Sequence, residues 1–152
     1  MKEMRGNFSG KGKKITVVIS RFNEFISSQL IEGCVDTLKK SGVADADISV
    51  IWTPGSFEIP QVISKLDTAK SDAIIALGAV IRGDTPHFDY IASEVAKGIA
   101  QLSLSKKIPI VFGVITADTL EQAIERAGTK QGNKGRDAAL TALEMATLYS
   151  QI

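Results

Sequence analysis

The chain has 152 residues, of which 44% are hydrophobic and 23% are charged, a globular composition that disfavours disordered and fibrous structures. A chain of this length can bury an ordinary core. Eighteen Lys and Arg residues against seventeen Asp and Glu residues leave a net charge of +1, so the basic surface typical of nucleic-acid-binding proteins is not expected. Residues 1–13 include three glycines and are expected to form an arm or an extra edge strand before a single domain at residues 14–152.

Beyond the arm, strands and helices are expected to alternate along the chain. Four continuous apolar runs, rich in β-branched residues, predict parallel strands buried on both faces, at residues 15–19, 48–52, 73–81 and 108–115. Apolar residues at helical spacing follow each run, in residues 26–38, 59–66, 91–102 and 120–127, and a last helix includes residues 139–146. This order predicts an α/β fold, a three-layer sandwich in which a four-stranded parallel sheet is flanked by helices.

Four loops of the predicted fold follow the carboxyl ends of the strands. They are RFNEFI, TPGSFEIP, RGDTPHFDY and TADT, which begin at residues 21, 53, 82 and 116. In open parallel sheets, ligands bind beyond the carboxyl ends of the strands, in the loops that lead into helices. The residues of these loops are therefore the first candidates for binding and catalysis.

His87 lies in the third of these loops and is the only histidine of the chain. Histidine exchanges protons near neutral pH, which makes His87 a candidate acid or base. A structural role is also open, because Asp84 or Thr85 before Pro86 is a good start for a helix. The turn at Gly83 could bind an anion through backbone N–H groups, although the Asp84 carboxylate would repel an anion if it faced the ligand.

The first and second loops contain residues with both a structural and a functional interpretation. Ser56 and Glu58 could cap the second helix and favour its dipole, or they could bind a polar heterocycle through a carboxylate and backbone amides. Phe22 could stack on a planar ligand or pack into the core. The glycine-rich motifs of dinucleotide-binding and P-loop proteins do not occur in the sequence, so neither kind of site has support from a motif.

Arg126 and Lys134 lie near the end of the fourth helical pattern and in the turn that follows it. No residue three or four positions from Arg126 is acidic, so the sequence gives its guanidinium no ion-pair partner within a helix. The side chain could bind a phosphate or be solvated. Lys134, in the Gly-rich turn of residues 129–135, could contact a ligand or the solvent.

No apolar run is long enough to cross a bilayer, which takes about 20 residues, so no membrane partner is expected. The basic start of the chain is not followed by the apolar segment of a signal peptide, and a cytoplasmic location is expected. Cys34 is the only cysteine, which excludes an intrachain disulfide and a cysteine-cluster metal site. A single histidine excludes a multi-histidine zinc site, and no metal is expected.

Taken together, the loops resemble those of the lumazine synthase family, which catalyses the penultimate step of riboflavin biosynthesis. The matching segments, between residues 6 and 149, are RFNEFI, PGSFEIP, GAVIRGDTPHFDYI, FGVITADTLEQAIERAGTK and GNKG. The resemblance implies a flavodoxin-like fold, in agreement with the predicted sheet. A noncatalytic flavin- or nucleotide-binding module, or a shell protein, remains an alternative, because fold alone does not fix function.

The resemblance also implies an activity and an assembly. Members of the family join 5-amino-6-(D-ribitylamino)uracil to 3,4-dihydroxy-2-butanone 4-phosphate and form 6,7-dimethyl-8-ribityllumazine, phosphate and water, without a metal or organic cofactor. They assemble as pentamers, decamers or icosahedral shells of sixty chains, and the short connection at residues 129–135 is similar to that of shell-forming members. We therefore expect a homo-oligomer, specifically a sixty-subunit shell, with riboflavin synthase as a candidate partner.

Carried over by position, the resemblance assigns roles to residues of the first three loops and of the third strand. His87 would transfer protons, and Phe22 would stack on the pyrimidine. The residues that would hold the ribityl chain and the ring are Ser56, Phe57 and Glu58, and those that would line the ring edge are Ala79, Val80 and Ile81. The turn that would meet the phosphate consists of Gly83, Asp84 and Thr85. Asp84 would contribute only its backbone N–H, with its side chain facing away.

In this family the site lies between neighbouring subunits. By resemblance, the adjacent chain would supply Phe112, Arg126 and Lys134. Arg126 would bind the phosphate of the substrate. The expected site is thus assembled from two copies of the chain, and its substrates are small molecules.

Overall fold

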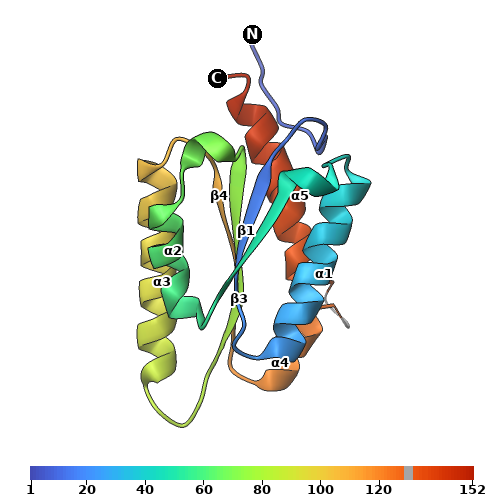
Figure 1. The fold of residues 1–152 in the computed structure, drawn as a ribbon. Helices are drawn as coiled ribbons and strands as arrows, with labels where there is room; N and C mark the ends of the chain where they lie inside the picture. The colour runs from blue at the N-terminus through green and yellow to red at the C-terminus, as the bar shows by residue number, and fades with distance from the viewer. Residues whose placement is uncertain (129–131) are drawn as a thin grey trace.

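The computed structural model describes residues 1–128 and 132–152 of the chain (Figure 1). Its centre is a parallel sheet of four strands in the order β2-β1-β3-β4. The strands are β1 (Ile15–Ser20), β2 (Ile48–Thr53), β3 (Ala73–Ile81) and β4 (Ile110–Ala117). All four predicted strands are present, and β4 begins two residues later than predicted, because Pro109 has no N–H to donate to the ladder.

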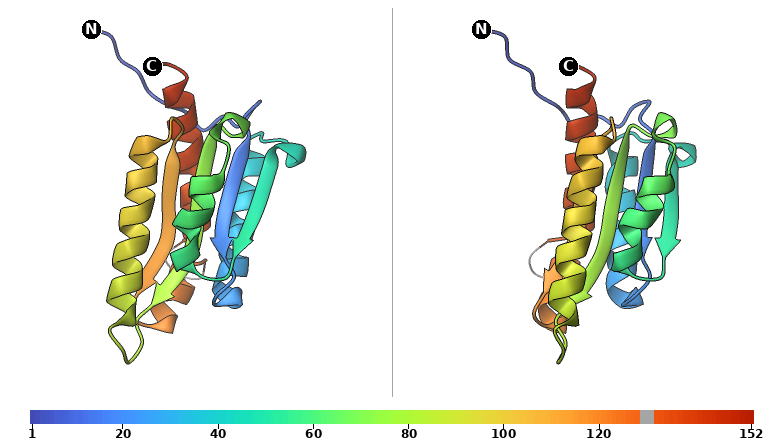
Figure 2. Two further views of the ribbon diagram at one scale, coloured as in Figure 1. Left: turned by 60° about the vertical axis from the view of Figure 1, so that its left-hand side comes forward. Right: turned by 90° about the vertical axis from the view of Figure 1, so that its left-hand side faces the viewer.

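Helices cover both faces of the sheet (Figure 2). One layer consists of α1 (Glu24–Lys40) and α5 (Lys134–Tyr149), and the other of α2 (Ile59–Lys65) and α3 (His87–Ser105). The short helix α4 (Leu120–Arg126) follows the carboxyl end of β4, and the 3₁₀ turns are η1 (Asp45–Asp47), η2 (Ser56–Glu58) and η3 (Thr68–Lys70). The predicted flavodoxin-like three-layer α/β sandwich is confirmed. Among the described helices, none combines the length and apolar character that a bilayer crossing requires.

The sheet divides the core in two, because successive residues of a strand point to opposite faces. On β1, Val17 and Ile19 pack in the cluster beneath α1 and α5, whereas Val18 packs in the cluster beneath α2 and α3. All three side chains are completely buried. β1 and β3 are the inner strands, and for them the prediction of burial on both faces is confirmed.

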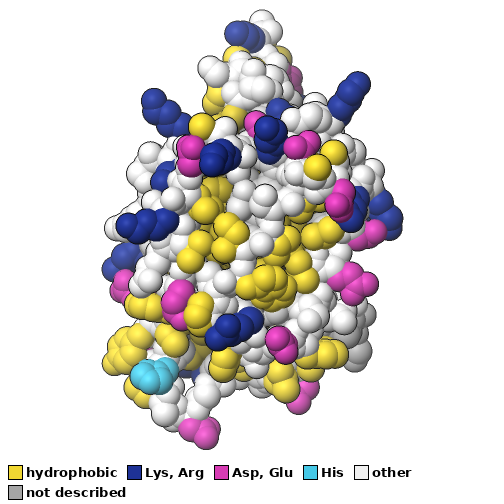
Figure 3. Space-filling view, in the orientation of Figure 1, with side chains coloured by type: hydrophobic (Ala, Val, Ile, Leu, Met, Phe, Trp, Pro, Cys, Tyr) yellow, Lys and Arg dark blue, Asp and Glu magenta, His cyan; other side chains and the backbone are white. Residues whose placement is uncertain are grey.

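For the two edge strands, the prediction of complete burial is wrong. On β2, the side chains of Val50 and Trp52 are 37% and 49% exposed, and on β4 that of Phe112 is 46% exposed. Each of these strands has a neighbour on one side only, so part of its surface is left uncovered. Hydrophobic side chains accordingly gather on the surface over the middle of β2 (Figure 3).

Residues 1–13 lie outside the four-stranded sheet and are fixed by hydrogen bonds to distant parts of the chain. The Asn7 N–H donates to the Thr147 hydroxyl of α5 at 2.8 Å, and the Gly10 N–H donates to the Ser41 carbonyl at 2.8 Å. Both termini lie at the end of the molecule opposite to the carboxyl ends of the strands (Figure 1). The loops predicted to carry function are therefore far from both termini.

Candidate active site

A cavity of about 350 Å³ lies at the carboxyl ends of β1, β2 and β3. Ten of the residues predicted for the site line it, namely Phe22, Ser56, Phe57, Glu58, Ala79, Val80, Ile81, Gly83, Thr85 and His87. They come from three loops and the last residues of β3. The parallel sheet brings these loops together, because all of its strands end at the same edge.

Phe22 faces this cavity at the junction of β1 and α1. Its side chain is 64% exposed, so the alternative that it packs into the core is wrong. The next residue, Asn23, has a left-handed backbone conformation with φ of 60°, which asparagine tolerates better than most residues. The Ser27 hydroxyl donates to the carbonyl oxygen of Ser20 at 2.6 Å. The left-handed turn at Asn23 and this hydrogen bond fix the loop that carries the phenyl ring.

Ser56 connects the second loop to the centre of the sheet. Its hydroxyl is buried and lies 3.3 Å from the Ser20 hydroxyl and 3.4 Å from the Ala79 carbonyl oxygen. Gly78 of β3 leaves room for this pair, because a Cβ there would lie 2.6 Å from one hydroxyl and 2.8 Å from the other. The Ser56 side chain does not cap α2, so that interpretation is wrong. Glu58 is half-buried at the cavity wall.

His87 is the first residue of α3, and its side chain is exposed at the rim of the cavity. In Figure 3, the single histidine lies beside hydrophobic side chains at the edge of the molecule. Its backbone N–H donates to the Thr85 hydroxyl at 3.4 Å, so Thr85 does support the start of the helix. Gly83 and Thr85 line the cavity, whereas Asp84 between them is exposed and does not. The role of the Asp84 N–H in phosphate binding stays a prediction.

Phe112, Arg126 and Lys134 line a second cavity, of about 410 Å³, that shares no lining residue with the first. It follows the free edge of β4, between the end of α4 and the start of α5. Arg126 is the last residue of α4, and its guanidinium donates to the Thr116 carbonyl at 2.9 Å. The predicted site residues thus form two groups on different parts of the chain.

Arg126 lies at the carboxyl end of α4 and not within the helix, so helical neighbours on its C-terminal side cannot pair with it. Because α4 ends at Arg126, no helical turn follows it, and residues 129–131 of the predicted turn lie outside the described residues. Within the described part of the chain, no ion pair involves Arg126. Its guanidinium retains donors that are available to a ligand.

A comparison with known protein families bears on this arrangement. Residues 12–150 match the family model described as 6,7-dimethyl-8-ribityllumazine synthase. The chain belongs to the lumazine synthase family. The match includes both cavities and all the loops of the candidate site. Membership of the lumazine synthase family implies an enzyme of the transferase type and a place in riboflavin biosynthesis.

In this lumazine synthase family member, the prediction from sequence omitted three residues that line the first cavity: Gly55, Phe88 and Ile91. Gly55 adjoins Ser56 in the second loop. The i, i+3 spacing of Phe88 and Ile91 would have extended the apolar row of the third helix to its first turn. This spacing alone predicts that the side chains of Phe88 and Ile91 face the sheet.

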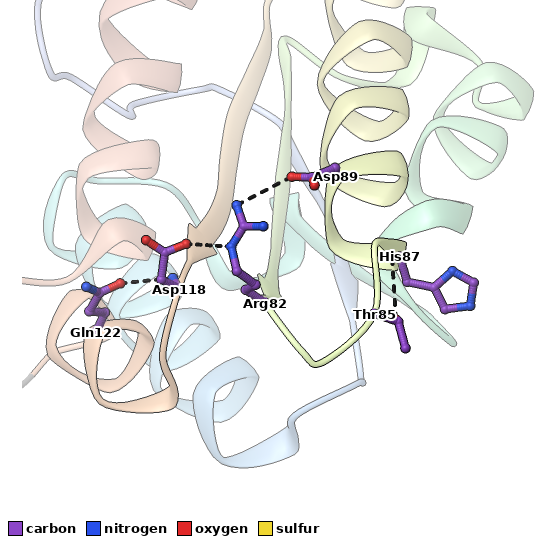
Figure 4. A network of polar contacts seen from close by, with 6 residues as sticks. All are labelled: Arg82, Thr85, His87, Asp89, Asp118 and Gln122. Carbon is purple, nitrogen blue, oxygen red and sulfur yellow. Dashed lines mark hydrogen bonds and ion pairs between the residues drawn. The ribbon is translucent and has the colours of Figure 1, made fainter.

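Arg82 follows β3 directly and lines neither cavity, but it pairs with two carboxylates, those of Asp89 and Asp118 (Figure 4). Its hydrogen bond to Asp118 raises the pKa of Arg82, so the guanidinium stays charged at every working pH.

Among the described residues, no three His, Cys, Asp or Glu side chains form a group that could bind a metal ion.

Proposed function

We propose that the protein condenses 5-amino-6-(D-ribitylamino)uracil with 3,4-dihydroxy-2-butanone 4-phosphate to 6,7-dimethyl-8-ribityllumazine, with release of phosphate and water. Family membership supports this reaction. The observation that carries it is the cavity at the carboxyl ends of the strands, in which ten of the predicted residues meet. Its volume of about 350 Å³ falls within the range of small-molecule sites.

The surfaces of this cavity suit the pyrimidine substrate. Phe22 and Phe57 are at least half exposed, so each offers an aromatic face or edge to a flat ring. The Ser56 hydroxyl is already engaged by Ser20 and Ala79, which leaves the backbone of the 3₁₀ turn and the Glu58 carboxylate to bind the polar groups of the substrate. Gly83 and Thr85 would meet the phosphate just before the start of α3.

The second cavity supports a site shared between two subunits. Phe112, Arg126 and Lys134 lie along an edge strand whose outer side is unpaired in a single copy. A neighbouring copy that covered this edge would bring the three residues to the first cavity of its partner. In our proposal, the domain of residues 14–152 assembles as a pentamer, and twelve pentamers form a shell of sixty chains.

Orientation supplies most of the proposed rate enhancement. The amine attacks the ketone to give an imine and a first water, elimination of phosphate leaves an enol that tautomerises to a second ketone, and the ribityl-bearing nitrogen attacks this ketone and closes the ring with loss of a second water. Because the reactants are intrinsically reactive, holding them side by side raises their effective concentration without a strong base. His87 transfers protons during these steps and contributes a factor of roughly 10² to 10⁴ at most.

Formation of the fluorescent lumazine from the two substrates tests the proposal. The purified protein should produce lumazine faster than the uncatalysed background. His87→Ala should lower kcat without abolishing turnover, by a factor of roughly 10² to 10⁴ at most. Arg126→Ala should raise KM for the butanone phosphate and leave KM for the pyrimidine within about twofold, because the only substrate contact that we assign to Arg126 is to phosphate.

The exposed Arg136 of α5 provides a matched control, since Arg136→Ala removes the same charge away from both cavities. Its kinetic constants should equal those of the unaltered protein. An unchanged KM for the butanone phosphate in Arg126→Ala would contradict the role of Arg126. Binding of both substrates without product formation would instead favour the noncatalytic binding module.

A further inference from the structure

Arg82 connects the loop that carries His87 to the end of β4. Its backbone N–H donates to the Ala117 carbonyl at 2.9 Å, and its Nε donates to the Asp118 carboxylate at 2.8 Å. A terminal nitrogen of the guanidinium lies 3.4 Å from the Asp89 carboxylate of α3. Figure 4 shows that the three side chains form a continuous chain of contacts. One side chain therefore joins the first turn of α3 to the start of the connection into α4.

The surroundings of Arg82 argue against a direct role in binding phosphate. Two carboxylates face its guanidinium and offset its single positive charge. The guanidinium carbon also lies 4.4 Å from the centre of the Phe88 ring, so one face of the group is covered. Arg82 is not among the residues that line either cavity. Its contacts are therefore with the protein frame around the site.

Among the residues that the structure describes, the loop after Arg82 has only local hydrogen bonds. The His87 N–H donates to Thr85, and the Asp89 N–H donates to the Pro86 carbonyl at 3.2 Å. Both bonds stay within the loop and the first helical turn, so neither fixes this segment against the sheet. Phe88 packs against the hydrophobic cluster beneath α2 and α3, and the contacts of Arg82 with Phe88 and Asp89 add an attachment to the end of β4 immediately beside His87. The His87 imidazole points away from Arg82, so any effect on it passes through the backbone (Figure 4).

The other end of this contact chain is held by two hydrogen bonds at the start of α4. The Asp118 N–H donates to the Gln122 side chain at 2.9 Å, and the Thr119 hydroxyl accepts from the Gln122 N–H at 3.2 Å. Thr119 thus caps the start of α4, and the Gln122 side chain satisfies the backbone N–H of Asp118 just before it. The backbone of Asp118 is held in this way, and its carboxylate attaches Arg82 to the end of β4.

We propose that Arg82 is a positioning residue that fixes the first turn of α3, and with it His87, against the end of β4. The inference rests on the proposed function. The Arg82 side chain is 46% exposed and its two partners are more exposed, so its ion pairs contribute little to folding stability. Its effect falls on the geometry of the site, where a displacement of about 1 Å lowers a rate by a factor of about 10².

Two substitutions separate positioning from charge. Arg82→Gln removes both the charge and the ion pairs, and should lower kcat by about tenfold or more without exceeding the loss in His87→Ala. KM for the pyrimidine should stay within about twofold, because Phe22 and Glu58 lie on other loops. Arg82→Lys keeps the charge but not the planar fork of donors, and should leave kcat low. Complete recovery of kcat in Arg82→Lys would overturn the positioning role.

A double-mutant cycle with His87→Ala tests whether Arg82 acts through the histidine. In the His87→Ala background, Arg82→Gln should have almost no further effect on kcat. Losses that multiply would show an independent, merely structural effect and overturn the proposal. Lys97→Ala is the matched control, since it removes an exposed ion pair with Glu94 on the same helix, and its kcat should be unchanged.

The single histidine gives a readout that does not depend on turnover. With ¹³C-labelled histidine, Arg82→Gln should shift the NMR signal of the His87 ring, whereas Lys97→Ala should not. Failure of the unaltered protein to form lumazine would reject the proposed function alone. An unmoved His87 signal in folded Arg82→Gln would reject the positioning role, whatever the reaction is.

Discussion

At the scale of single residues, Cys34 shows how completely one face of α1 is removed from water. Its side chain has an exposed fraction of 0% and packs in the same cluster as Leu30 and Leu38, each one turn away. Burial raises the pKa of the Cys34 thiol to about 12, because a thiolate there would lose its hydration. The thiol therefore stays protonated and unreactive in the folded protein at neutral pH.

Burial of the Cys34 thiol should lower the free energy of unfolding at high pH. An unperturbed cysteine titrates near 9.0, so between that pH and about 12 the unfolded chain has lost a proton that the folded protein keeps. The free energy of unfolding consequently decreases over this interval and is unaffected by Cys34 at lower pH. Between pH 8 and pH 10.5, urea unfolding should show a loss of about 2 kcal/mol more than in Cys34→Ala. Equal losses in both proteins would contradict the raised pKa.

The residues of the site differed in how far local sequence could predict them. Phe22, Glu58 and His87 lie in the segments that follow predicted strands, so the rule for ligand sites in parallel sheets was enough to select their loops. The partners of Ser56 and Arg82 could not be predicted in this way. Ser20 is 36 positions from Ser56, and Asp118 is 36 positions from Arg82, so these contacts depend on which strands are neighbours.

At the scale of elements, α1 and α5 approach so closely that only glycine fits between them. A Cβ added at Gly135 would overlap the carbonyl oxygen of Leu30, and one added at Gly33 would lie 2.5 Å from the Asn133 side chain. Asn133 in turn caps α5 through the Arg136 N–H and donates to the Gln29 carbonyl of α1 at 2.9 Å. The start of α5, where Lys134 lies, is therefore fixed by its packing against α1.

Gly135→Ala should destabilise the protein although alanine favours helices. The gain in helix propensity is about 1 kcal/mol, whereas the forced separation of two packed helices costs about 1–3 kcal/mol or more. Thermal or urea unfolding should show a net loss. The neighbouring exposed position provides the control, and Arg136→Ala should change stability by less than about 0.5 kcal/mol. A more stable Gly135→Ala protein would contradict the close packing.

The order of the elements followed from periodicity, but their neighbours in the sheet did not. Apolar runs predicted all four strands, and helical spacing predicted the five helices. Both predictions were possible because the spacing of buried apolar residues differs between strands and helices. From its continuous apolar run, β2 was predicted to be buried on both faces, as an inner strand is. Its position at an edge depends on the crossover connections, and only the pairing of β1 with both β2 and β3 reveals it.

At the scale of the whole molecule, the candidate site is divided between two cavities that one chain does not join. Five chains of 16.2 kDa have a mass of about 81 kDa, and sixty have a mass of about 970 kDa. Light scattering should give the larger value. Free pentamers alone would reject the shell, and monomers would reject the shared site.

Mixed oligomers test the shared site directly. In a random mixture of His87→Ala and Arg126→Ala chains, about a quarter of the interfaces should unite an intact His87 with an intact Arg126. Activity should then rise above the mean of the two separate variants. No rise would mean that both residues act within one chain.

The fluorescence of the exposed Trp52 indole reports on the free edge of β2. Trp52 is the only tryptophan of the chain, and its side chain is 49% exposed on that strand. All indole emission therefore originates from one position on the surface. Any chain that covers this edge will transfer the indole to a drier environment and move its emission to shorter wavelength, without an added dye.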